Sequence, residues 1–141
     1  MKPLLVGELN PYGPDETFAL YPSPRGSAGQ RLAEFVMGLD RADYLRRFDR
    51  ANLCTFKWSV PAARERAGEL LQRDNPVLVL LGAKVAGAFG QIFEPFTVRR
   101  TALASRTLVV LPHPSGLCRV WNEPNAVARA RAALRLAGVL P

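Results

Sequence analysis

Hydrophobic positions along the chain follow two patterns, short unbroken apolar runs and longer stretches with helical spacing. The unbroken runs lie at residues 4–6, 77–81 and 107–111, with a weaker one at 51–54. Such runs are typical of strands buried on both faces of a sheet. Because stretches long enough for helices separate them, the pattern predicts an α/β fold. We expect a three-layer α/β/α sandwich with a short parallel central sheet.

The expected helices begin at recognisable capping or turn residues. Ser27 is a predicted N-cap, and Leu32, Phe35, Val36 and Leu39 follow at the spacing of a core-facing helix. Four more helices are expected to start near Asp40, Ser59, Gly82 and Glu123. Residues 8–26 contain four prolines and no sustained period, which predicts a long loop. Loops of that length in a compact domain tend to carry function.

Length and composition narrow the class of protein. A chain of 141 residues with 48% hydrophobic residues can build one core, so we expect a single domain over residues 1–141 and exclude disorder. The apolar runs are too short to span a bilayer, and the N-terminus does not read as a secretory signal. Two distant cysteines, Cys54 and Cys118, exclude a disulfide framework and any four-cysteine metal site. We therefore expect a cytoplasmic protein without a membrane partner.

The net charge of +7 has two interpretations. A basic excess favours a polyanionic partner such as nucleic acid. However, the cations are 16 Arg and only 3 Lys, beside many Ala, Pro and Gly, which is also the signature of a GC-rich genome. Composition alone leaves the two interpretations open.

Polar, sharply turning segments follow three of the predicted strands, at residues 7–12, 52–58 and 112–119. In parallel sheets ligands bind at the carboxyl ends of the strands, so these segments are expected to carry function. His113 is the only histidine and stands between two prolines. A neutral imidazole held there could donate a hydrogen bond to a developing oxyanion, or merely cap the strand end. Glu8, Asn10 and Tyr12 fit neither a dinucleotide fingerprint nor a P-loop, and a plain Asn-Pro turn is the alternative.

Two of these segments carry a family resemblance. The residues Gly-Glu-Leu-Asn-Pro-Tyr at 7–12 and His-Pro-Ser-Gly-Leu-Cys-Arg at 113–119 together resemble the uracil-DNA glycosylase superfamily. The first is similar to a mixture of its mismatch-specific and uracil-specific branches. Residues 26–32 resemble the helix entry of the thermophile-type branch, whose iron–sulfur cluster two cysteines cannot hold. The resemblance implies a uracil-DNA-glycosylase-like fold over nearly the whole chain.

The resemblance also implies roles in catalysis and base binding. Asn10 matches the position that activates water, and His113 matches the histidine that stabilises O2 of the departing base. Tyr12 matches the aromatic that excludes a 5-methyl group, and Asn52 the asparagine that reads the pyrimidine edge. An asparagine cannot act as a general base, so Glu8 is a candidate to assist.

Other matched positions concern stacking and the DNA duplex. Tyr21 most nearly matches the aromatic that stacks on a flipped base, with Phe18 as the competitor. The matched DNA-binding residues lie in the segment after the last strand: Ser115, Gly116, Leu117 and Arg119. Ser115 would pinch a phosphate, and Leu117 would fill the gap that the flipped base leaves in the stack.

The expected function is hydrolysis of the N-glycosidic bond of uracil, or of a related deaminated or modified pyrimidine, in single- or double-stranded DNA. No metal or redox cofactor is implied, and we expect a monomer. Two alternatives remain: a protein that binds nucleic acid or a nucleotide without cleaving it, and an enzyme acting on free nucleotides or nucleosides. Phe56 and Trp58 flank Lys57, a pattern that suits either a nucleic-acid groove or core packing. Trp121 is expected to stiffen the preceding loop.

Overall fold

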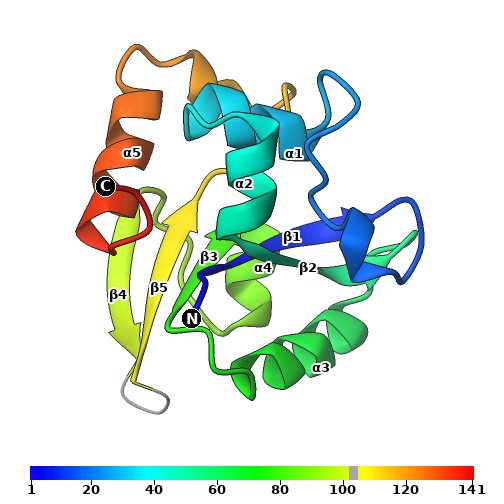
Figure 1. Ribbon diagram of the computed structural model, residues 1–141. Helices are drawn as coiled ribbons and strands as arrows, with labels where there is room; N and C mark the ends of the chain where they lie inside the picture. The colour runs from blue at the N-terminus through cyan, green and yellow to red at the C-terminus, as the bar shows by residue number, and fades with distance from the viewer. Residues whose placement is uncertain (102–104) are drawn as a thin grey trace.

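A five-stranded, mostly parallel sheet forms the centre of the computed structural model, which describes residues 1–101 and 105–141 (Figure 1). The strands are β1 (Leu4–Asn10), β2 (Asp49–Thr55), β3 (Val77–Leu81), β4 (Thr97–Thr101) and β5 (Arg106–Leu111). Their order is β2-β1-β3-β5-β4, and only β4 runs antiparallel to its neighbour. The predicted α/β class with a parallel sheet is therefore confirmed.

Helices cover both faces of this sheet. One face carries α1 (Ala28–Gln30), its continuation η2 (Arg31–Val36), α2 (Arg41–Arg47) and α5 (Ala126–Leu136). The other face carries α3 (Val60–Leu71) and α4 (Ala83–Ala88). Two single turns, η1 (Glu16–Phe18) and η3 (Arg119–Asn122), lie in the connections. Figure 1 shows α5, α1 and α2 above the sheet and α3 below it.

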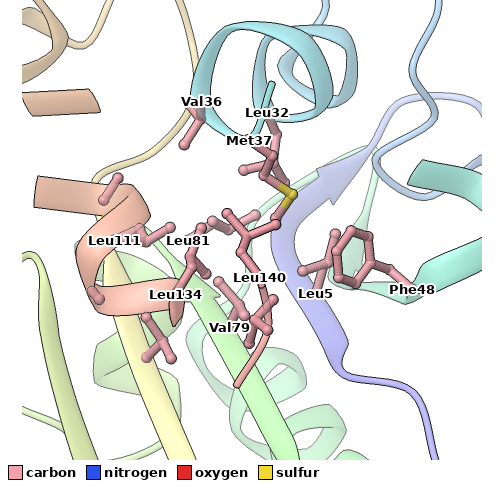
Figure 2. Packing of buried hydrophobic residues seen from close by; sticks show 14 of the residues in the cluster. Leu5, Leu32, Val36, Met37, Phe48, Val79, Leu81, Leu111, Leu134 and Leu140 are labelled. Carbon is pink, nitrogen blue, oxygen red and sulfur yellow. The ribbon is translucent and has the colours of Figure 1, made fainter. Parts of the chain in front are cut away.

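The strands divide their side chains between two hydrophobic clusters. Leu5, Val79, Leu81 and Leu111 point to the α5 side, where Figure 2 shows them meeting residues of η2 and α5. The next residues along each strand, such as Leu4, Leu78 and Leu80, point to α3 and α4. Because a strand alternates its side chains between faces, an unbroken apolar run requires cover on both.

The predicted helix starts are confirmed wherever a side chain caps the first turn. The hydroxyls of Ser27 and Ser59 accept hydrogen bonds from Gln30 N and Ala62 N, and the Asp40 carboxylate accepts from Asp43 N. Each cap satisfies a main-chain N–H that has no partner within its helix. The last helix, however, begins at Ala126 and not at Glu123, whose backbone is extended. The residue before a proline is biased away from the helical region, which explains the later start.

Phe35 departs from its predicted place in the core. Residues 31–36 form a π-helical turn, in which Met37 N donates to Leu32 O at 2.9 Å. The wider turn keeps Leu32 and Val36 buried but rotates Phe35 outward, so its side chain is exposed.

Two further predictions need correction. Strand β1 extends to Asn10, so residues 7–10 belong to the strand and the loop is shorter than residues 8–26. Strand β4 was not predicted, because it is a short edge strand of Thr, Val and Arg with only partial burial. No helix in the part of the chain that the structure describes is long and apolar enough to cross a membrane.

Candidate functional site

A cavity of about 440 Å³ opens where β1, β2 and β5 end. Six of the residues singled out in the sequence line it: Glu8, Tyr12, Phe18, Tyr21, Asn52 and His113. They come from both ends of the chain, and the parallel sheet brings them together because its strands end at the same edge. The size lies within the range of small-molecule sites, about 300–1,000 Å³.

His113 is held as a hydrogen-bond donor toward this cavity. Ser115 N donates to its Nδ1 at 3.1 Å, so a neutral ring carries its proton on Nε2. Burial lowers the pKa of His113 from its usual value, the Glu8 carboxylate partly opposes that shift, and the Lys84 ammonium reinforces it. The ring is therefore neutral at neutral pH, with Nε2–H free to donate.

Two side-chain hydrogen bonds hold the His113 loop. Trp121 Nε1 donates to His113 O at 2.7 Å, as expected for a residue that stiffens this segment. Arg31 Nε donates to Pro114 O at 2.9 Å, across 83 positions of the sequence. The Arg31 guanidinium also lies over the ring of Phe35, which packs edge-on against Trp121. Sequence reasoning did not identify Arg31, because nothing local links it to the histidine.

Gly82 allows Glu8 and His113 to approach each other. A Cβ at Gly82 would lie 3.3 Å from His113 Cβ and 3.5 Å from Glu8 Oε1, and the backbone φ of 101° there favours glycine. The carboxylate and the imidazole therefore face the same small space at the end of β3.

The side-chain oxygen of Asn52 has no hydrogen-bond donor among the described residues. Its Oδ1 is buried and accepts no hydrogen bond from the residues that the structure describes. It lies over Gly7, where an added Cβ would approach it to 2.5 Å. A buried, unpaired carbonyl oxygen is costly, about 1–3 kcal/mol, unless a ligand or water supplies a donor.

Three aromatic rings form the wall of the cavity. Tyr12 and Phe18 meet edge to face with ring centroids 6.4 Å apart, and Phe18 meets Tyr21 at 5.9 Å. Arg41 Nη2 donates to the Tyr21 hydroxyl at 2.7 Å, and the guanidiniums of Arg41 and Arg50 lie over the Tyr21 ring. Phe18 and Tyr21 both line the cavity, so either is placed to stack on a flat ligand.

Asn10 is buried but does not line this cavity. Its Oδ1 accepts from Tyr12 N at 3.0 Å and its Nδ2 donates to Asp15 O at 3.0 Å. It faces instead a neighbouring cavity of about 300 Å³, which Asn52 also lines. The carboxamide of Asn10 thus stabilises the turn after β1, and Glu8 is the polar side chain of this segment that faces His113.

The predicted DNA-binding residues lie outside the cavity, in the loop after His113. Leu117 is 93% exposed, and Gly116 and Arg119 are exposed as well. The Ser115 hydroxyl accepts from Leu117 N at 3.1 Å, and Ser115 O accepts from Cys118 N. These bonds form a tight turn that presents Leu117 to solvent.

The structure adds residues that sequence reasoning missed. Ser27 and Gly29 line the cavity at the start of α1, and a Cβ at Gly29 would approach Tyr21 O to 2.2 Å. The glycine is therefore required for the helix to pack against the loop that carries Tyr21. Within residues 1–101 and 105–141, no three His, Cys, Asp or Glu side chains are grouped to hold a metal ion.

Comparisons with known proteins did not assign the chain to a family: neither a scan against protein-family models nor a search of curated proteins found a match.

Proposed function

We propose that the protein is a DNA glycosylase that hydrolyses the N-glycosidic bond of uracil or a related deaminated or modified pyrimidine. One observation carries the proposal: His113, a neutral donor, Glu8, and Asn52, whose buried Oδ1 has no partner, all line one cavity walled by aromatic rings. An enzyme that acts on a base must extrude it, hold it by edge hydrogen bonds and stacking, and stabilise the leaving group.

Each polar group matches one feature of a pyrimidine. The free Oδ1 of Asn52 accepts from N3–H of the base, and its Nδ2 donates to O4. Phe18 or Tyr21 stacks on the ring, a contact that contributes about 1–3 kcal/mol per base. Tyr12 stands at the rim, where it disfavours bulky 5-substituents.

The chemistry follows from the remaining two side chains. The C1′–N1 bond breaks and its electron pair moves onto the base, where the negative charge reaches O2. The Nε2–H of His113 donates a hydrogen bond to O2 and the imidazole stays neutral. Glu8 holds a water that attacks C1′ and accepts its proton, which then passes to the departed base. We assign this step to Glu8 because the carboxamide of Asn10 is bonded within its own turn.

The fold is consistent with a uracil-DNA-glycosylase-like domain. The two motifs that carry the resemblance lie on β1 and directly after β5, at the same edge of the sheet. Leu117 projects from the rim of that edge, where it would enter the space that a flipped base leaves. DNA as partner, a monomeric state and a cytoplasmic location remain predictions.

A second candidate function is binding without cleavage. It is favoured by one observation: the residue matched to water activation is an asparagine whose polar atoms are both engaged. In that case the cavity would hold a pyrimidine nucleotide with no release of the base.

The test is base release from uracil-containing single- and double-stranded oligonucleotides, followed by heating in alkali to cut at abasic sites. We expect strand scission by the unaltered protein and its loss in His113→Ala and Glu8→Gln. Glu65→Gln is the matched control, because Glu65 is exposed on α3 and does not line the candidate cavity. Asn10→Ala should retain scission if its protein is folded.

The outcomes separate the two functions. Tight binding of the oligonucleotides without scission for any modified pyrimidine would establish the binder. Scission that persists in Glu8→Gln but is lost in a folded Asn10→Ala variant would return the water-activating role to position 10.

A further inference from the structure

The segment after β2 carries aromatic side chains that the cavity does not use. Phe56 is 69% exposed, so it does not contribute to the core. Its φ is 60°, a conformation that costs a residue with a side chain about 1–3 kcal/mol. Phe56 N donates to Asn10 O, and the ring lies beside Gly13, the residue that follows Tyr12 in the sequence. The backbone is thus held in a strained state that keeps an aromatic ring in solvent beside Gly13, which lines the neighbouring cavity of about 300 Å³.

Trp58 lines a separate groove of about 230 Å³ together with Val60, Arg64 and Lys84. The indole is half-buried, and the Lys84 Nζ lies 5.6 Å from its ring centroid. Lys57, between the two aromatic residues, is exposed. None of these three cations forms an ion pair with a carboxylate in the described part of the chain. The groove therefore combines an aromatic face with uncompensated positive charge.

The groove is connected to the candidate site through Lys84. This lysine stands two residues after Gly82, against which Glu8 and His113 pack. The Lys84 ammonium also contributes to the lowered pKa of His113. Tyr12, Phe56 and Trp58, with Lys57, Lys84 and Arg64, form what we call the aromatic strip.

We propose that the aromatic strip binds the single-stranded nucleic acid that flanks the nucleotide in the cavity, with bases stacked on Phe56 and Trp58 and phosphates near Lys57, Lys84 and Arg64. This inference rests on the proposed function and names its substrate as single-stranded DNA. Stacking on an exposed ring requires an unpaired base with a free face, which a duplex does not offer. The cations favour a polyanion over an apolar peptide or a second copy of the same basic chain.

The experiment follows the fluorescence anisotropy of a dye-labelled thymidine oligonucleotide, which contains no uracil, as the full chain is added. This signal belongs to the oligonucleotide, so it also reports binding by a variant that lacks Trp58. We expect the single strand to bind at much lower protein concentration than the matching duplex. Phe56→Ala and Trp58→Leu should each weaken binding roughly 5- to 150-fold, the range for loss of one stacked base. Phe56 is exposed, so its variant keeps the test valid if Trp58→Leu folds poorly.

Two controls separate the strip from general effects. Ile92→Ala removes an equally exposed apolar side chain elsewhere and should bind like the unaltered protein. Lys57→Ala should reduce the slope of log affinity against log salt by about 0.7, as for one lost phosphate contact on a single strand, whereas Lys2→Ala should not.

The result that overturns the inference is single-strand affinity unchanged in both Phe56→Ala and Trp58→Leu, or a duplex that binds as tightly as the single strand. The proposed function is tested separately. If the protein releases uracil but the strip variants bind the oligonucleotide as tightly as the unaltered protein, the role of the strip alone is refuted. Strip-dependent binding of the thymidine oligonucleotide without release of any base would refute the glycosylase alone.

Discussion

The hydrogen bond from Trp121 Nε1 to His113 O, which we call the brace, gives the sharpest test of how the loop is held. Trp121→Phe removes the Nε1–H that donates to His113 O at 2.7 Å and leaves that carbonyl without its partner. A lost hydrogen bond with an unpaired, part-buried acceptor costs about 1–2 kcal/mol. The smaller ring also leaves a gap beside Phe35 and Phe96, which adds about 1 kcal/mol. We expect the free energy of unfolding to fall by about 2–3 kcal/mol in urea titrations.

The effect should also reach the imidazole. The chain has one histidine, so its ring protons give a single set of NMR signals, which should shift or broaden in Trp121→Phe. Base release should fall roughly 10- to 100-fold in kcat with KM little changed, since His113 is proposed to act on the leaving group. Phe96→Leu is the control: it removes an edge contact with Trp121 at 6.0 Å but leaves the hydrogen bond. If both variants lose the same stability and neither moves the histidine signals, the brace does not position His113.

Three further predictions concern charge, close approach and burial. Burial holds the pKa of His113 in the folded chain below its usual 6.5. As the pH falls, the imidazole therefore takes up its proton at a higher pH in the unfolded chain than in the folded one. The contribution of His113 to the free energy of unfolding should therefore be constant above about pH 6.5 and fall as the pH drops toward the pKa of the folded chain. Lys84→Met should raise the pKa of His113 in an NMR titration. An unchanged pKa in that variant would contradict the electrostatic link between the two side chains. Gly29→Ala should lower thermal stability and weaken uridine binding together, because its Cβ would meet Tyr21 O at 2.2 Å. Tyr44→Phe should cost about 1–2 kcal/mol in urea, since the buried hydroxyl donates to a main-chain carbonyl at 2.8 Å; an unchanged midpoint would refute that value.

Much of the architecture is encoded locally. The runs at β3 and β5 required cover on both faces, and the caps at Ser27, Asp40 and Ser59 marked three helix starts. Both signals depend on residues within one or two turns of each other, which is why the sequence alone reveals them. The edge strand β4 was missed because its residues are half-exposed and carry neither pattern.

The sequence likewise predicted only part of the candidate site. Local motifs pointed to Glu8, Asn52 and His113, and the rule that ligands bind at the carboxyl ends of parallel strands placed them at one edge. The sequence did not show that Asn10 would turn into its own loop and leave Glu8 facing the imidazole.

By itself, then, the sequence determined the layered fold and the short segments from which the site is drawn, because hydrophobic period and capping act between near neighbours. Only the tertiary structure decided which polar atoms stay free. The contact of Arg31 with Pro114 spans 83 residues, and the packing of Gly82 against Glu8 and His113 joins three strand ends. Such contacts depend on the order and register of the strands, which leave no trace at any single position.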